Sequence, residues 1–167
     1  MPGNLRIHQG DPAPLVEAAF QRIYIEHMSD VPIVNPALQV QALDFTLWQD
    51  NWLGVLITPW CINLLLLPGP TGHWQSVSGN HRLFHGFPSG NYAFLGGEEA
   101  EIGEYQSCSL ISAMGQFPDQ DSARAVAREV IKNMLKAPDP VPDTLKKEHN
   151  REAAPSLSKR KFLLLGS

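Results

Sequence analysis

A tryptophan-rich stretch in the first half of the chain most constrains the fold, because it holds three short apolar segments separated by turn residues. Leu43–Trp48 alternates apolar and polar side chains, as a half-buried strand does. Trp52–Ile57 and Cys61–Leu67 are almost wholly apolar. Thr58-Pro59-Trp60 separates these two segments, and Pro68-Gly69-Pro70 closes the last one. Short strands joined by short turns predict an antiparallel meander.

Two amphipathic segments flank this region and predict helices. Asp11 is placed to cap the first helix, with Pro12 at its first position, and Asp119-Gln120-Asp121-Ser122 begins the second. Four more strands are expected, at residues 74–77, 82–86, 91–95 and 104–111. The predicted fold class is α+β: an antiparallel β-sheet meander with an N-terminal and a C-terminal helix packed against it.

The chain of 167 residues predicts one domain followed by a tail. Residues 1–136 are expected to form the single α+β domain. Residues 137–167 are rich in proline and basic residues, which is typical of a linker or mobile tail. That tail ends in Phe162-Leu163-Leu164-Leu165-Gly166, a short apolar segment expected to dock.

Charge is distributed unevenly along the chain. Residues 1–118 hold three basic residues against ten acidic ones, whereas residues 119–167 hold ten basic residues against seven acidic ones. An acidic body disfavours nucleic acid and favours a cationic partner, although the same acidity could serve only solubility. No signal peptide is visible, and the apolar run Trp52–Pro68 is interrupted and shorter than the ~20 residues of a membrane span. We therefore expect a cytoplasmic protein without membrane insertion.

The residues that could carry chemistry do not form a recognisable catalytic or metal-binding pattern. Cys108 lies near Ser109 and Ser112, but no G-x-S-x-G motif surrounds them and no cation is close in sequence. His81 and His85 are four residues apart, with His73 nearby, yet no carboxylate or thiolate completes a ligand set. The sequence predicts no catalytic residue, no metal and no cofactor. A metal- or thiol-active enzyme that uses His81, His85 and Cys108 is the competing hypothesis.

Two cysteines leave the redox state open. Cys61 and Cys108 have apolar neighbours, which favours buried free thiols in a reducing cytosol, while a single disulfide between them is the alternative.

Binding residues are easier to nominate than catalytic ones. The alternation in the first strand places Trp48 with Asp44, opposite Phe45 and Leu47, so Trp48 is expected to face outward as an interface anchor. Four glutamates follow a Gly-Gly pair and form either a solvated turn or a site for cations of a partner: Glu98, Glu99, Glu101 and Glu104.

The order and spacing of these motifs resemble the HybE family, which includes the HoxT and HupJ proteins. The resemblance rests on Asp44-Phe45-Thr46-Leu47, Trp52-x-Gly54-x-x-Ile57-Thr58-Pro59-Trp60, Pro68-Gly69-Pro70 and Tyr105-x-Ser107-Cys108-Ser109-Leu110, and more weakly on Arg160-x-x-Leu163-Leu164-x-Gly166. It covers about residues 12 to 136 and the last few residues.

The resemblance implies a [NiFe]-hydrogenase maturation chaperone. Such a protein would bind the hydrogenase small-subunit precursor, with its twin-arginine signal peptide or its immature iron–sulfur subunit, and prevent premature export. This chain lacks the CxxC motifs of the rubredoxin domain fused to some relatives, so it is expected to bind no iron. The alternative is a scaffold that joins other accessory factors through the basic tail.

Two sets of site residues follow from this interpretation. The expected partner contacts are Asp44, Trp48, Glu98, Glu99, Glu101 and Glu104. The residues expected to support the surface from beneath, or to carry the motif, are Phe45, Leu47, Trp52, Ile57, Pro59, Trp60, Pro68, Pro70 and Cys108.

Overall fold

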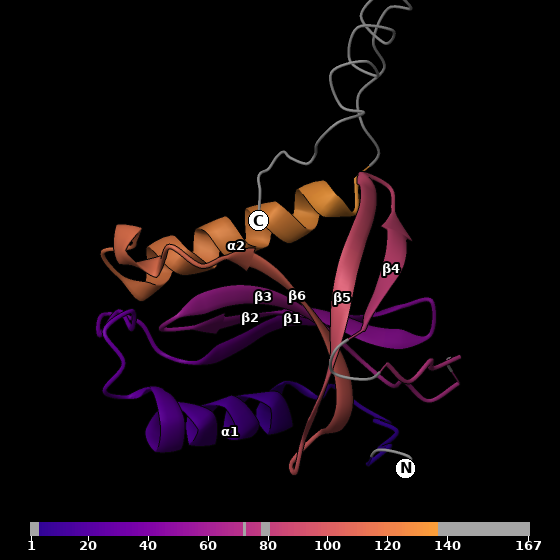
Figure 1. Cartoon of the computed structure of the whole chain (residues 1–167). Helices are drawn as coiled ribbons and strands as arrows, with labels where there is room; N and C mark the ends of the chain where they lie inside the picture. Colours follow the sequence, from indigo (N-terminus) through magenta and orange to yellow (C-terminus); the bar gives the residue numbers. More distant parts are fainter. Residues whose placement is uncertain (1–3, 72, 78–80, 137–167) are drawn as a thin grey trace, which may run out of the picture. The chain divides into compact units, whose positions relative to one another are not determined.

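A computed structural model describes residues 4–71, 73–77 and 81–136. The chain forms two α-helices, one short π-helix, one 3₁₀ turn and six strands in this part (Figure 1). In chain order they are α1 (Ala13–Ile23), η1 (Tyr24–Met28), β1 (Gln41–Trp48), β2 (Asn51–Thr58), β3 (Cys61–Leu67), β4 (Arg82–Phe87), β5 (Gly90–Glu99), β6 (Gly103–Ile111), η2 (Met114–Gln116) and α2 (Gln120–Met134). The predicted α+β class is confirmed. The predicted tail, residues 137–167, lies outside the described residues.

The six strands form one antiparallel sheet with the order β1-β2-β3-β6-β5-β4. Strands β1 to β3 are one meander and β4 to β6 are a second. The two meanders join through β3 and β6, where Leu64 pairs with Cys108. The strands of the second meander therefore follow one another across the sheet in reverse chain order. As a result, β1 and β4 are the two edge strands of the sheet.

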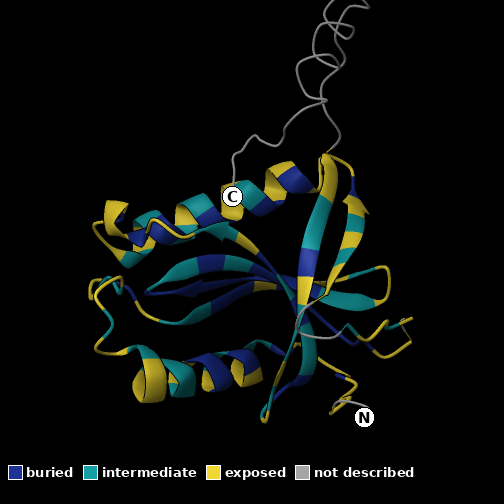
Figure 2. Ribbon diagram, viewed as in Figure 1, coloured by how far each residue is buried: buried dark blue, intermediate teal, exposed yellow. Residues whose placement is uncertain are grey.

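The helices cover opposite faces of the sheet, with α1 on one side and α2 on the other (Figure 1). On the α1 side, Phe20 packs with Leu56 and Leu65. On the α2 side, Ala127 and Ile131 pack with Val55 and Leu64, which alternate with Leu56 and Leu65 along β2 and β3. Strands β2 and β3 are apolar on both faces because a helix covers each face. Most of their residues are accordingly buried (Figure 2).

Helix α2 begins as the sequence predicts, since the Asp119 carboxylate accepts a hydrogen bond from the Ser122 backbone N–H at 2.8 Å. Helix α1 begins slightly later than expected. Pro12 is its N-cap residue, and the Asp11 carboxylate accepts from the Ala13 N–H at 2.9 Å. No helix among the described residues is long and apolar enough to cross a membrane.

A β-bulge in β1 overturns the predicted orientation of two side chains. Leu43 pairs with Val55 and Thr46 pairs with Leu53, so Asp44 and Phe45 together face the single residue Gly54. Asp44 adopts φ 58°, a conformation that aspartate tolerates better than most residues. The extra residue reverses the alternation beyond it.

As a result, Trp48 turns to the α2 side and is half-buried, whereas the sequence placed it facing outward. Leu47 is 53% exposed, whereas the sequence placed it beneath the surface. The bulge places Trp48 on the face of Leu43, while Phe45 and Leu47 remain on the opposite face. The sequence treated the face of Trp48 as open to solvent, whereas α2 covers it.

A second correction concerns residues 74–77, which the sequence predicts as a strand. The segment is irregular and lies over β5 and β6 without joining the sheet. Side chains hold it there: the Trp74 indole N–H and the Ser76 hydroxyl both donate to the Glu104 carboxylate, at 3.1 and 2.6 Å. Gly96 allows the close approach, because a Cβ at that position would lie 2.0 Å from the Val77 carbonyl oxygen.

The Pro68-Gly69-Pro70 motif has a packing explanation. A Cβ on Gly69 would lie 2.0 Å from the Asp50 backbone oxygen, so only glycine allows the chain after β3 to pass the turn between β1 and β2. The Asn51 side chain accepts a hydrogen bond from the Gly69 N–H at 3.0 Å. Gly69 thereby holds the chain after β3 against the turn between β1 and β2.

Candidate functional site

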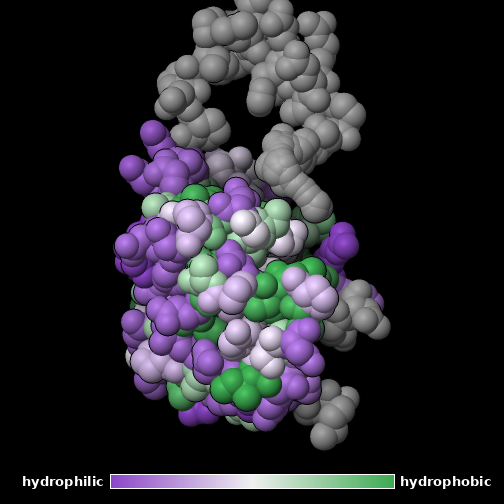
Figure 3. All heavy atoms as spheres, turned by 90° about the vertical axis from the view of Figure 1, so that its left-hand side faces the viewer, coloured by the Kyte–Doolittle hydropathy of each residue, from purple (hydrophilic) through white to green (hydrophobic). Residues whose placement is uncertain are grey.

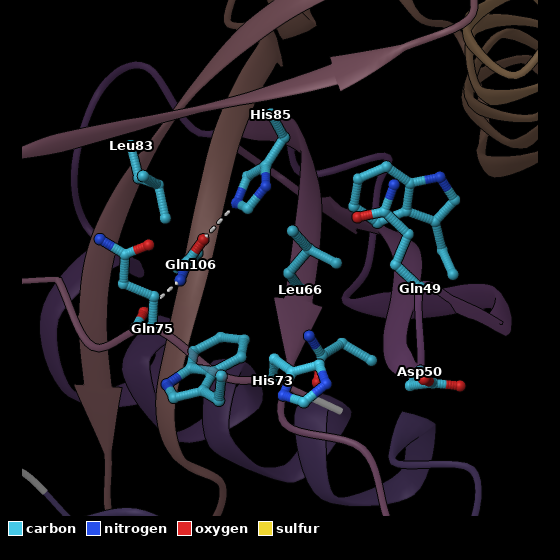
Figure 4. Close-up of a pocket in the computed structure, with 11 residues that line it drawn as sticks. Gln49, Asp50, Leu66, His73, Gln75, Leu83, His85 and Gln106 are labelled. Carbon is cyan, nitrogen blue, oxygen red and sulfur yellow. Dashed lines mark hydrogen bonds between the residues drawn. The ribbon is translucent and has the colours of Figure 1, made fainter. Parts of the chain in front are cut away.

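A pocket of about 240 Å³ opens on the α2 side of the sheet, between the turn that joins β1 to β2, the irregular segment before β4, and the inner face of β4 (Figure 4). Its lining residues come from five separate parts of the chain: Trp48, Gln49, Asp50, Asn51, Leu66, His73, Trp74, Gln75, Leu83, His85 and Gln106.

The pocket lining contains one side chain of the Asp, Glu, Lys and Arg types, and the turn between β1 and β2 contributes it. Gln49 and Asp50 both adopt positive φ, 49° and 68°, as a tight hairpin turn between β1 and β2 requires. Asp50 is exposed, and no Lys or Arg lines the pocket. The described lining therefore favours a cationic or neutral occupant over an anionic one.

Gln106 fixes the floor of the pocket. It is 1% exposed, its side-chain oxygen lies 2.7 Å from the His85 Nε2, and its amide nitrogen donates to the Gln75 backbone oxygen at 2.8 Å (Figure 4). If His85 carries its proton on Nε2, it is the donor to Gln106. This chain of hydrogen bonds ties β4, β6 and the irregular segment together, so the polar floor is rigid.

Trp48 forms one wall. Its ring stacks on Phe87, with centroids 4.3 Å apart, and meets the His85 ring edge-to-face at 5.8 Å. Trp48 ends β1 and Phe87 ends β4, so the stack joins the two edge strands of the sheet. The sequence nominated Trp48 as a contact residue for its outward position. In the structure, Trp48 does not project outward but forms a wall of the pocket.

The four glutamates lie in and around the turn between β5 and β6 and already have partners within the chain. The Arg22 guanidinium donates to Glu99 at 2.7 Å and to Glu101 at 2.8 Å. These hydrogen bonds raise the pKa of Arg22 above its ordinary value, and the bond from Arg22 lowers the pKa of the Glu101 carboxyl. Glu104 accepts from Trp74 and Ser76, as described above.

The remaining acidic nominees are engaged as well. Glu98 accepts from the Asn4 backbone N–H at 3.1 Å, and Asp44 pairs with Arg128 of α2 at 3.1 Å. All six nominated contact residues therefore make contacts inside the chain. A partner's cation at Glu99 or Glu101 would have to compete with Arg22.

Most of the residues expected to support the surface are buried or half-buried. Phe45, Ile57, Pro59, Pro68 and Cys108 are buried, and Trp52 and Trp60 are half-buried. The Trp52 indole N–H donates to the His8 carbonyl at 2.9 Å, and Trp60 stacks on Tyr24 with centroids 6.0 Å apart. Leu47 and Pro70 are exposed.

The two thiols are free in the structure. Cys108 belongs to the α2-side core, while Cys61 follows the alternation of Leu65 and Leu67 on the α1 side. Burial raises the pKa of the Cys108 thiol to about 11 and also raises that of Cys61. Both thiols are therefore protonated at neutral pH, which disfavours nucleophilic chemistry.

A metal centre gains no support from the described geometry. Within residues 4–71, 73–77 and 81–136 no group of three His, Cys, Asp or Glu side chains is placed to hold a metal ion. His85 bonds to Gln106, while His81 and His73 are exposed.

Sequence reasoning missed most of the pocket. Gln106 is one of several polar residues in β6, and Leu83, Gln49 and Asn51 follow no functional pattern. Their proximity depends on the order β3-β6-β5-β4, which brings β4 and β6 beside the first meander. No local pattern in the sequence predicts that order.

Exposed apolar side chains indicate surfaces that could be covered. On the side of the molecule at the left of Figure 1, hydrophobic side chains form separate areas divided by hydrophilic ones (Figure 3). Phe84 of the edge strand β4 is the most exposed of the large hydrophobic residues described, at 65%. Within the described residues, a pocket of side-chain size therefore lies beside an unpaired sheet edge, an arrangement typical of proteins that bind polypeptides.

Comparison with known proteins agrees with this class. The sequence matches the family model described as "[NiFe]-hydrogenase assembly, chaperone, HybE" over residues 11–166. The chain belongs to the HybE family of [NiFe]-hydrogenase assembly chaperones.

Individual relatives show the same relationship. Protein HoxT of Cupriavidus necator is 38% identical over 160 residues, 89% of this chain and 85% of HoxT. The protein described as "Probable rubredoxin HupJ" of Rhodobacter capsulatus is 38% identical over 120 residues, 72% of this chain but only 43% of HupJ. The solution structure of HybE from Escherichia coli superposes with a TM-score of 0.67 at 29% identity, covering 86% of this chain and 88% of that one.

Proposed function

We propose that this protein is a cytoplasmic chaperone that binds the hydrogenase small-subunit precursor and prevents its premature export. It acts by binding, without turnover and without a cofactor. The observation that carries the proposal is the match to the assembly-chaperone family along nearly the whole chain, combined with a binding pocket that holds no nucleophile.

The charge and chemistry of the pocket support a basic client segment. Asp50 gives the pocket its formal negative charge, and Trp48 and Trp74, whose ring systems attract cations, also line it. An arginine of the precursor that lies beside apolar residues would suit such a pocket. Family membership therefore indicates a hydrogenase subunit as the client, and the charge of the pocket favours a basic segment of that client.

A pull-down tests the proposal directly. The tagged chain is mixed with the small-subunit precursor, with the same subunit lacking its signal peptide, and with the hydrogenase large subunit as the control. We expect the precursor to be retained and the large subunit to pass through. Retention of neither form of the small subunit overturns the proposal.

A scaffold that joins other accessory proteins is the second candidate. The family match extends to residue 166, so the basic tail belongs to the shared pattern. Deleting residues 137–167 separates the two functions. Loss of accessory-protein binding with precursor binding intact assigns that second role to the tail.

A further inference from the structure

Strand β4 is an open edge of the sheet. It pairs with β5 in unbroken register from Arg82↔Leu95 to Phe87↔Gly90, and no strand among the described residues pairs with its other side. The opposite edge, β1, is interrupted by the bulge at Asp44, a device that hinders strand addition. Strand β4 lacks such an interruption, so its outer backbone groups can pair with another chain.

One face of this edge is apolar and exposed. Phe84 pairs with Ala93, and Leu95 lies two residues further along β5, so all three side chains share the face turned away from α2. Phe84 is 65% exposed and Leu95 is 42% exposed. Arg82 lies on the same face as Phe84, so a basic residue placed there would meet a like charge.

The other face of the same strand borders the pocket. Leu83 and His85 alternate with Phe84 along β4, and both line the pocket beside Trp48, Trp74 and Asp50. Its volume of about 240 Å³ is below the range typical for drug-sized ligands and suits one long side chain. Aromatic faces and a carboxylate are the groups that a guanidinium prefers.

We propose that β4 takes up an extended segment of the client polypeptide as an additional strand. The segment places an arginine side chain in the pocket and the apolar residues on either side of it against Phe84 and Leu95. Neighbouring residues of a strand point to opposite faces, so one segment satisfies both requirements only if arginine is flanked by apolar residues. The identification of the client rests on the proposed function, whereas the site rests on β4 and its pocket.

Synthetic peptides test the backbone and side-chain requirements with the full chain. The probe is a fluorescent peptide Ser-Leu-Arg-Leu-Phe-Leu-Ser, and its binding is followed by anisotropy. Replacing its arginine by glutamate should weaken binding by about tenfold or more. N-methylation at one set of alternate residues should have a similar effect, and N-methylation at the other set should not, because only alternate N–H groups of an added strand face β4. Equal effects of both sets overturn strand addition.

Two matched substitutions test the site on the protein. Phe84→Lys should weaken peptide binding about tenfold, while Ile25→Lys, at a residue 63% exposed in η1, should leave it unchanged. Asp50→Asn should weaken the arginine peptide more than a peptide with leucine in its place. Equal responses to Phe84→Lys and Ile25→Lys overturn the assignment to β4.

Two further outcomes separate this site from the proposed function and from self-association. If the precursor is retained by the chain and its retention is unaffected by Phe84→Lys, the proposed function stands and the β4 site fails. If the peptide binds as expected but the precursor does not, the site stands and the proposed client is wrong. A dimer that Phe84→Lys dissociates, with no peptide binding, assigns β4 to a second copy of this chain and overturns the proposal.

Discussion

The Trp48 ring stacks on the Phe87 ring with centroids 4.3 Å apart and planes 20° apart. Trp48 is the last residue of β1 and Phe87 the last of β4, the two strands at opposite edges of the sheet. The contact is possible because the sheet twists enough to bring one end of each edge strand together. It supports the wall of the pocket and closes one end of the α2-side core.

Replacing Trp48 by alanine should lower the free energy of unfolding by about 2–3 kcal/mol, because it removes a half-buried aromatic side chain and its stacking contact with Phe87. Urea denaturation followed by circular dichroism measures this. Leu47→Ala is the matched control at the exposed neighbouring residue, with an expected loss below about 0.5 kcal/mol. Equal losses in the two variants would contradict the reversed alternation beyond the bulge.

Gly69→Ala should destabilise the protein by about 1–3 kcal/mol, since the new methyl group would meet the Asp50 backbone oxygen, which cannot move as a side chain could. Gly115→Ala is the control, because nothing lies within 4 Å of a Cβ there. Thermal unfolding of both variants compares them. A melting temperature of Gly69→Ala equal to that of Gly115→Ala would refute the steric explanation of the Pro-Gly-Pro motif.

His8 should make stability depend on pH on the mildly acidic side. Its ring is 4% exposed and donates to the Ile102 carbonyl oxygen at 3.0 Å. Burial lowers the pKa of His8 below its usual 6.5, and the Arg6 charge lowers it further against the opposing effect of that hydrogen bond. The unfolded chain takes up a proton at a higher pH than the folded chain, so stability falls as pH drops below about 6.5.

Denaturation from pH 7.5 to 5.5 should show this loss in the natural chain and a smaller one in His8→Gln, which keeps a donor for Ile102. NMR titration should give His8 a pKa below 6.5. A pKa above that value would reverse the sign and disprove the prediction.

Glu101 should contribute on the more acidic side. The hydrogen bond from Arg22 lowers the pKa of the Glu101 carboxyl below its usual 4.5. Its contribution to stability is therefore present above pH 4.5 and is lost as pH falls through the lower, folded-state value. Arg22→Gln should be less stable at neutral pH and should lose less on acidification. Arg82→Gln, at an arginine without an ion pair among the described residues, should keep the natural acid profile.

The fold class could be predicted because the features that specify it are local. Apolar periodicity and turn residues predict the strands before Pro68, and the Asp119 cap predicts the start of α2. The bulge could not be predicted in the same way, because Asp44 and Phe45 continue a regular alternation. Only the pairing partner Gly54, which leaves room for the Phe45 ring, explains why the strand gains a residue there.

The candidate site was harder to predict, because its parts are distant in sequence. Trp48 was chosen because its face was expected to be open to solvent, whereas it packs on the α2-side core. Gln106 and Leu83 were not chosen at all. The sequence did not predict the partner of Glu99 and Glu101, since Arg22 lies on another element, α1. Ion pairs between residues distant in sequence decide which charged side chains remain available to a partner protein, and residue spacing does not reveal such pairs.

The junction between β3 and β6 also has a consequence for folding kinetics. Each meander consists of hairpins with short turns, so its contacts are local and can form rapidly. The pairing of Leu64 with Cys108 instead requires closure of a long loop, and only after that step does the α2-side core become continuous. We therefore expect assembly of the two meanders to be the slow, entropy-limited event, and the edge of β3 to be open to pairing with other chains until it is complete.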